Sequence, residues 1–141
     1  MNPFAATPLI GRTALVTGST SGLGAGIAIA LAAAGAHVVV TGRTSARGQR
    51  VVAQIESDGG RATFVPVDFS DGPDAIAAVT ATATEAVDGR LDILVNNVAT
   101  LIQPAPTSDV TTAEIRAAFD VSVLTPFQLT GNGGPGDGAA R

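Results

Sequence analysis

The sequence lacks tyrosine, lysine, cysteine and tryptophan, and it holds a single histidine, His37, in 141 residues. Without cysteine the chain can form neither a disulfide nor a thiolate metal site, and one histidine excludes a histidine-rich metal site. We therefore expect no metal. The missing tyrosine and lysine also remove two of the side chains that enzymes use for proton transfer.

Positive charge is scarce as well. The formal net charge is −4, and all eight basic residues are arginines dispersed along the chain. No arginine cluster could displace counterions over a phosphate backbone, so we expect no nucleic-acid partner. Residues 1–8 lack the basic and apolar regions of a secretory signal, which favours a cytoplasmic location.

Residues 13–42 carry no aspartate, glutamate, lysine or arginine, and this stretch is long enough to span a bilayer. Its middle is rich in alanine, however, and Gly18, Gly22, Gly24 and Gly35 interrupt it. A buried strand–helix–strand explains the same residues better, so we expect no membrane partner.

Strand and helix patterns alternate through the rest of the chain. Strands are predicted at 13–17, 38–41, 62–67 and 91–95, and helices at 24–34, 45–58, 73–87 and 111–130. The pattern predicts an α/β fold of the Rossmann type, with a parallel sheet and helices on both faces. Pro66 favours an edge position for the third strand.

Three regions follow from this pattern. Residues 1–10 form an extension, 11–130 a dinucleotide-binding domain, and 131–141 a glycine-rich tail that we expect to be disordered. Ile27, Leu31 and Ala34 recur at helical spacing, which predicts the first helix. The pair Thr111 and Glu114 fits a capping box at the start of the last helix.

Gly18, Gly22 and Gly24 lie where the first strand turns into the first helix. Glycines here allow a tight turn, the approach of a phosphate to the backbone, and close packing of helix on strand. The helix N-terminus would offer free amides to a pyrophosphate. The alternative is a tight turn without a ligand.

Arg43 follows the second strand, where a dinucleotide fold places the residue that contacts the adenine ribose. A carboxylate there would bind a free 2′-hydroxyl, whereas a guanidinium matches a 2′-phosphate. We therefore expect NADP(H) to be favoured over NAD(H). The alternative is a solvent-exposed arginine at a helix start.

With Asn96-Asn97-Val98-Ala99 after the fourth strand, the chain resembles the short-chain dehydrogenase/reductase family from about residue 11 to 130. Thr17-Gly18-x-x-x-Gly22-x-Gly24 matches the coenzyme motif of the family, and Asp68 matches its adenine-contacting acid. The resemblance implies a nicotinamide dinucleotide partner. It implies the following coenzyme contacts: Thr17, Gly18, Ser19, Ser21, Gly22, Leu23, Gly24, Arg43, Asp68, Phe69, Asn96 and Val98.

The chain also departs from the family. Ser122 stands where the family has a catalytic asparagine, and the catalytic Tyr-x-x-x-Lys pair expected after Thr130 is absent. The resemblance therefore implies a fold truncated after the fourth strand and the following helix, with no catalytic residue of its own. The family strand order would leave the fourth strand on an open edge.

Four functions stay open at this point. The first is an oxidoreductase that moves hydride between NADP(H) and a carbonyl or alcohol. The second is a coenzyme-binding remnant without turnover. The third is an interaction module that forms a homo-oligomer or docks onto a full-length relative through its fourth strand and last helix. The last alternative is a truncated remnant without selected function.

Overall fold

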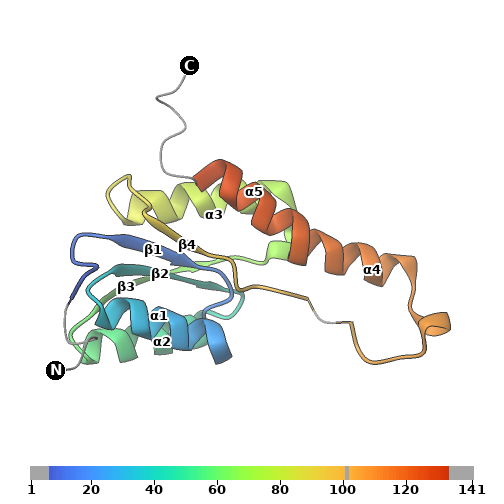
Figure 1. The fold of residues 1–141 in the computed structure, drawn as a ribbon, viewed down its shortest axis with the longest axis horizontal. Coiled ribbons are helices and arrows are strands. Elements are labelled where there is room, and N and C mark those ends of the chain that lie inside the picture. Colours follow the sequence, from blue (N-terminus) through green and yellow to red (C-terminus); the bar gives the residue numbers. More distant parts are fainter. Residues whose placement is uncertain (1–6, 101, 134–141) are drawn as a thin grey trace, which may run out of the picture.

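The chain folds around a four-stranded parallel sheet with helices on both faces (Figure 1). The computed structural model describes residues 7–100 and 102–133. Its strands are β1 (Thr13–Val16), β2 (His37–Gly42), β3 (Arg61–Pro66) and β4 (Ile93–Val95). Its helices are α1 (Gly22–Ala33), α2 (Ser45–Ser57), α3 (Pro73–Ala86), α4 (Thr112–Phe119) and α5 (Thr125–Gly133), with short helical turns η1 (Phe69–Asp71), η2 (Thr107–Asp109) and η3 (Asp120–Leu124). The predicted α/β class is confirmed.

The strands lie in the order β3-β2-β1-β4, and every pair is parallel. In the register, Leu15 of β1 lies opposite Val39 of β2 on one side and Leu94 of β4 on the other. β3 is at one edge, as Pro66 predicted. Because all strands run the same way, their carboxyl ends meet at one end of the sheet, called here the carboxyl end, and their starts at the amino end.

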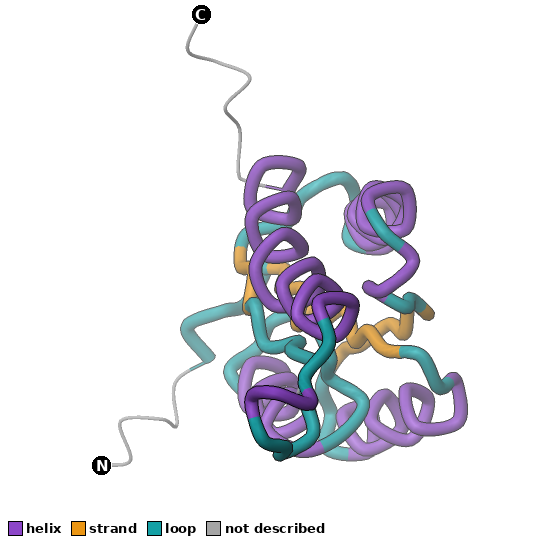
Figure 2. Tube along the Cα trace, turned by 90° about the vertical axis from the view of Figure 1, so that its right-hand side faces the viewer, coloured by secondary structure: helices purple, strands orange, loops and turns teal. Residues whose placement is uncertain are grey.

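Side chains along the central strands alternate between two hydrophobic cores. Leu15 and Val39 pack into a core with α3 and α5, whereas Ala14 and Val16 pack into another with α1 and α2. Figure 2 shows the strands between these two helical layers. Burial on both faces is the reason that the strands are apolar throughout.

The face of α1 that lies against the sheet consists of small residues. Ile27, Leu31 and Ala34, which show the helical spacing, are half-buried. The buried residues of α1 are Gly24, Ala28 and Ala32. Small side chains face the sheet because they let the helix lie close to it, and the larger ones flank the contact.

The predicted last helix is interrupted and longer than expected. The capping box of Thr111 and Glu114 is present at the start of α4. A π-helical turn, η3, then separates α4 from α5. α5 continues to Gly133, so the expectation of disorder from residue 131 is wrong for 131–133. Glycine destabilises a helix by only about 1 kcal/mol, and the fully buried Leu129 holds this helix against the core. Residues 134–141 lie outside the described residues.

β4 is shorter than predicted, because Leu91 and Asp92 precede the strand rather than belong to it. Within the described ranges β4 pairs only with β1, and its three residues are half-buried. This is the open edge expected from the sequence.

The amino end of the sheet is held by the carboxylate of Asp92. It accepts a hydrogen bond from the Thr13 amide at 2.9 Å and pairs with Arg90 at 2.9 Å and Arg12 at 3.2 Å. Burial alone would raise the pKa of Asp92, but these hydrogen bonds outweigh it and lower the pKa to about 2. The carboxylate thus ties β1 to the segment leading into β4.

His37 begins β2 at this amino end and is half-buried. Its Nε2 lies 2.9 Å from Oγ1 of Thr63 on β3. Burial, together with the nearby Arg61, lowers the pKa of His37, and Asp88 opposes this only in part. Its place in the fold explains this side chain without a ligand.

The charge-free stretch 13–42 forms β1, α1 and β2, which confirms the strand–helix–strand interpretation. Among the described helices, none is long and apolar enough to cross a membrane.

Candidate functional site

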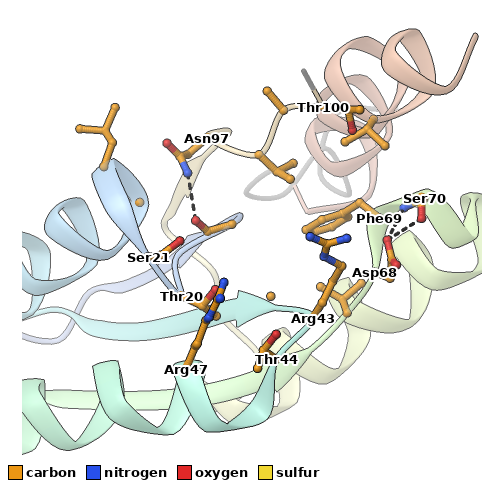
Figure 3. Close-up of a pocket in the computed structure, with 18 of the residues that line it drawn as sticks. Thr20, Ser21, Arg43, Thr44, Arg47, Asp68, Phe69, Ser70, Asn97 and Thr100 are labelled. Atoms are coloured by element: carbon orange, nitrogen blue, oxygen red, sulfur yellow. Dashed lines mark hydrogen bonds between the residues drawn. The ribbon is translucent and has the colours of Figure 1, made fainter. Parts of the chain in front are cut away.

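A cavity of about 790 Å³ opens at the carboxyl end of the sheet (Figure 3). Its walls come from the β1–α1 turn, the β2–α2 turn, the segment after β3, the segment after β4, and the last helical region. The end of a parallel sheet where strand order reverses is the usual ligand position in open α/β folds. Here β1 lies between β2 and β4, so the connection after β1 leads to one side of it and the connection after β3 leads to the other.

The glycine turn after β1 is closed tightly on itself. Gly18 has a φ of +64°, which favours glycine, and a Cβ on Gly24 would lie 2.3 Å from the Gly18 carbonyl oxygen. The same Cβ would lie 2.5 Å from Nδ2 of Asn97. Only glycine at 24 allows α1 to begin this close to the turn.

Asn97 joins the segment after β4 to this turn. Its Nδ2 donates to the carbonyl oxygens of Thr17 and Gly18, at 3.0 and 3.1 Å. The buried Thr17 hydroxyl accepts from the amides of Asn97 and Val98, at 2.9 and 3.0 Å. Four hydrogen bonds therefore fix one cavity wall against another.

Ser19 has a structural role in the same turn. It is fully buried, donates to the Val16 carbonyl at 2.7 Å and accepts from the Thr41 amide at 2.9 Å. Its hydroxyl therefore holds the turn against β2 and does not line the cavity.

Arg43 and Arg47 reach the cavity from the start of α2. Figure 3 shows both guanidinium groups projecting into the same space, Arg47 on the side of Thr20 and Arg43 on the side of Asp68. Neither arginine forms a salt bridge within the described part of the chain. This wall of the cavity is therefore cationic.

Asp68 and Phe69 form the wall after β3. Hydrogen bonds from the Ser70 hydroxyl at 2.6 Å and the Ser70 amide at 2.9 Å lower the pKa of Asp68, and Arg43 lowers it further. Phe69 is buried in the α3-side core and still lines the cavity. An ionised carboxylate therefore stands beside an aromatic ring.

Ser122 lies in the π-helical turn η3, next to the cavity-lining Val121. Its hydroxyl accepts a hydrogen bond from the Thr100 amide at 3.2 Å. Thr125, at the end of the turn, donates its hydroxyl to the Asp120 carbonyl at 3.1 Å, which accommodates the wider turn. π-Helical turns within α-helices are frequent at functional sites.

Most of the predicted contact residues lie around this cavity, and four do not. Lining it are Gly18, Ser21, Leu23, Gly24, Arg43, Asp68, Phe69 and Val98. Outside its lining are Thr17, Ser19, Gly22 and Asn96. Thr17 and Ser19 lie behind the wall as supports, and Asn96 is exposed.

Sequence reasoning missed several lining residues, among them Thr20, Thr44, Arg47, Asn97 and Thr100. For two of these residues the sequence contains a signal that could have identified them. Arg47 is the third residue of a helix that starts at 45 and Arg43 lies just before that helix, so both stand at the same helix end. Asn97 is the second residue of the asparagine pair already identified.

A nicotinamide dinucleotide fits these features. Gly18 and Gly24 of the turn line the cavity without a Cβ, the first turn of α1 carries no acidic residue, and the wall at α2 supplies two cations. A pocket of several hundred Å³ is also the size at which small ligands and cofactors bind.

A sequence model of the short chain dehydrogenase family matches residues 12–135. The chain belongs to this family. It is 43% identical over 117 residues to an uncharacterised oxidoreductase of Methylorubrum extorquens, covering 82% of this chain and 46% of the relative.

Two solved structures show the same fold. A metagenomic short-chain oxidoreductase in complex with NADP has a TM-score of 0.84 at 36% identity, covering 90% of this chain and 57% of that one. A 3-oxoacyl (acyl-carrier-protein) reductase of Agrobacterium tumefaciens with NADP bound has a TM-score of 0.84 at 34% identity, covering 96% and 51%. The chain spans about half the length of these relatives.

Proposed function

We propose that this chain is the coenzyme-binding half of a short-chain dehydrogenase/reductase, and that it binds NADP(H) at the carboxyl end of its sheet. The observation that carries the proposal is the glycine turn locked by Asn97 beside a cavity lined by two arginines, neither of which forms a salt bridge within the described residues. Solved relatives with NADP at 34% and 36% identity support it.

The roles divide along the cavity. The turn from Gly18 to Gly24 and the N-terminus of α1 receive the pyrophosphate, because free amides and a helix dipole favour an anion there. Asp68 and Phe69 receive the adenine by a carboxylate acceptor and an aromatic face. Val98 contacts the ribose on the nicotinamide side. Asn96 acts only through its backbone, since its side chain is exposed and outside the cavity lining.

The preference for NADP(H) over NAD(H) is part of this proposal. Arg43 follows β2 and lines the cavity, and no carboxylate stands at this position to bind a free 2′-hydroxyl. A guanidinium offers a planar fork of donors that suits phosphate.

The bound coenzyme would supply hydride chemistry between a carbonyl and an alcohol. The 141 residues contain no tyrosine or lysine for the accompanying proton transfer. Ser122, which stands at the catalytic asparagine position, accepts from the Thr100 amide. We therefore propose that this chain, taken alone, binds coenzyme without turnover.

Isothermal titration calorimetry with NADPH and NADH tests binding, and an absorbance assay with a panel of carbonyls and alcohols tests turnover. The expected result is binding of NADPH several-fold tighter than NADH, with no coenzyme oxidation. Failure of both coenzymes to bind overturns the proposal and favours a remnant without selected function. Turnover by the purified chain overturns only the proposal that the chain lacks catalysis, and leaves the proposal of coenzyme binding in place.

The last helical region favours a second candidate, an interaction module. Ile115, Phe119, Val123 and Phe127 are all exposed apolar side chains on α4, η3 and α5, and Phe127 is 76% exposed. These side chains and the open edge of β4 are two apolar features that a second copy or a full-length relative would cover. Light scattering of the wild type and of Phe127→Asp tests this: a dimer lost in the variant supports it, and a wild-type monomer with and without a relative opposes it.

A cytoplasmic location completes the proposal, because a cysteine-free chain needs no oxidising compartment to fold. Cell fractionation checks it.

A further inference from the structure

A second cavity, of about 320 Å³, lies at the amino end of the sheet and is called here the amino-end cavity. Its lining comes from the segment before β1, the turn after α1, the starts of β2 and β3, and the segment after α3. In Figure 1 these parts gather where the strands begin, opposite the candidate coenzyme site. A cavity of this size can hold a small molecule.

Positive charge dominates the lining of the amino-end cavity. Arg12, Arg61 and Arg90 line it, whereas Asp88 is the one acidic residue in the lining that the described residues form. Asp92, which pairs with Arg12 and Arg90, lies outside the lining and adds a second carboxylate. Three of the eight arginines therefore gather at one cavity, in a chain whose formal net charge is −4.

The register of the sheet brings Arg61 to this cavity. His37 lies opposite Thr13 of β1 on one side and Arg61 of β3 on the other, so the first residues of three adjacent strands stand in a row. Arg61 is exposed and forms no salt bridge within the described residues. Burial and then the charge of Arg61 lower the pKa of His37. The guanidinium therefore acts on the imidazole, and no carboxylate pairs with it there.

Arg12 and Arg90 are held in place around the cavity. Nε of Arg90 lies 2.9 Å from Asp92 Oδ1, and a terminal nitrogen donates to the Gly11 carbonyl at 3.1 Å. Arg12 donates to the same Asp92 oxygen at 3.2 Å. Each guanidinium has five N–H donors, and these contacts use one of Arg12 and two of Arg90. The remaining donors are preorganised, which reduces the entropy that a ligand must overcome.

Negative groups at the same end restrict which anion fits. α3 ends at Ala86, and a helix C-terminus carries a partial negative charge. Asp88 follows with a full charge and also acts on His37, whose pKa it raises. Net attraction alone is therefore small, and a monovalent ion without directional hydrogen bonds gains little. A multivalent anion with several acceptor oxygens gains more, because it can accept from more than one guanidinium group.

We propose that the amino-end cavity binds the phosphate group of a small anion through Arg12, Arg61 and Arg90. A phosphate group carries about −1.5 to −2 charges and three strong acceptor oxygens, whereas a carboxylate carries one charge and two oxygens. The planar fork of an arginine matches phosphate geometry. The inference goes beyond the proposed function, because the coenzyme cavity lies at the other end of the sheet.

His37 provides a readout that is specific to this site. It is the only histidine in the sequence, and it lines the amino-end cavity. Its ring resonances are followed by NMR while inorganic phosphate, glycerol 3-phosphate or succinate is added, with sodium chloride at equal ionic strength as the control. Both phosphates should shift the resonances saturably and raise the pKa of His37, because a nearby anion favours the imidazolium. Succinate should bind more weakly, and sodium chloride should give no saturable shift.

Two variants of the lining carry opposite expectations. Arg61→Gln should weaken phosphate binding about tenfold, the ratio that about 1.4 kcal/mol produces. Asp88→Asn removes a repelling carboxylate and should strengthen phosphate binding about threefold, as expected for an exposed charge. Without phosphate, Arg61→Gln should raise the pKa of His37 and Asp88→Asn should lower it.

Arg50→Gln is the matched control, because Arg50 is an exposed arginine of α2 outside the lining of the amino-end cavity. Its phosphate affinity should stay within about twofold of the wild type. Thermal unfolding checks that all three variants are folded.

The inference is overturned if phosphate shifts the His37 resonances no more than sodium chloride does at equal ionic strength. Equal phosphate affinity of Arg61→Gln and the wild type overturns it as well. Succinate that binds as tightly as phosphate overturns the assignment to a phosphate group. None of these results bears on coenzyme binding at the carboxyl end, which is measured with NADPH and NADH.

Discussion

The two ends of the sheet differ in whether their charged side chains have salt-bridge partners. At the amino end, the Asp92 carboxylate is matched by Arg12, Arg90 and the Thr13 amide. At the carboxyl end, Arg43 and Arg47 have no salt-bridge partner within the described residues, and the backbone turns tightly around glycine. The matched charges around Asp92 hold the strands together, and the unmatched arginines at the carboxyl end are free to bind the anionic coenzyme.

The largest expected effect comes from Gly24→Ala at the carboxyl end. The added methyl group would lie 2.3 Å from the Gly18 carbonyl oxygen and 2.5 Å from Asn97 Nδ2. We expect a loss of about 1–3 kcal/mol in unfolding free energy from overpacking, measured by urea unfolding, and loss of detectable coenzyme binding.

Gly26→Ala is the control on the same helix, because nothing lies within 4 Å of its Cβ position. It should leave coenzyme affinity unchanged and raise stability by about 0.5–1 kcal/mol. Equal behaviour of the two variants would contradict the packing that closes the turn.

Thr17→Val should have the next largest effect. The substitution keeps the shape of the side chain but leaves the Asn97 and Val98 amides without their acceptor, at a cost of about 1–3 kcal/mol. Urea unfolding measures this cost, and calorimetry should show weaker coenzyme binding because the two cavity walls separate.

Thr13→Val sharpens the comparison at the amino end. It removes the hydroxyl that contacts Asp92 and the Arg90 carbonyl, so stability should fall. Coenzyme affinity should stay the same. Weaker coenzyme binding in Thr13→Val would show that the two ends are not independent.

Asp92→Asn tests the matched end through pH. The pKa of Asp92 is about 2 in the folded chain against an ordinary value of 3.8, so the folded state favours the ionised form. The resulting stabilisation is complete above about pH 4 and is lost as the pH falls toward about 2. Thermal unfolding across this range should show a shallower decline in Asp92→Asn than in the wild type.

Glu56→Gln, an exposed carboxylate on α2, should keep the decline of the wild type. If Asp92→Asn and the wild type lose stability identically as the pH falls, Asp92 is not the group responsible for the acid decline.

The smallest expected effect is that of Ser122→Ala. The Thr100 amide loses its acceptor but is exposed, so water replaces it and the cost is below about 1 kcal/mol. Hydrogen exchange of the Thr100 amide should become faster, while Arg12 and Asp92 at the other end stay paired. Unchanged exchange would mean that Ser122 does not hold this segment.

The features that sequence reasoning predicted correctly are local ones. Apolar strands, the glycine turn after β1, and the capping box at Thr111 depend on residues close together in the chain. The buried face of α1 depended on a distant partner. Close contact with the sheet places the small Ala28 and Ala32 against it, whereas the helical spacing of Ile27 and Leu31 did not show which residues face the sheet.

The candidate site shows the same limit. Glycines 18 and 24 and Arg43 were found by their positions after strands and Asp68 by its match to the family, and all four line the cavity. Thr17 and Ser19 were expected as contacts but serve as buried supports, because hydroxyl orientation depends on strands 20 to 80 residues away. The π-helical turn around Ser122 has no sequence signal of its own.

The most direct measurement is thermal unfolding by far-ultraviolet circular dichroism, with and without NADP⁺ at about 100 times its Kd. A ligand that binds only the native state stabilises it by about 2.7 kcal/mol at that concentration. The account predicts one cooperative transition that moves upward with NADP⁺ and less with an equal concentration of NAD⁺. An unfolding midpoint that neither coenzyme raises would contradict the account.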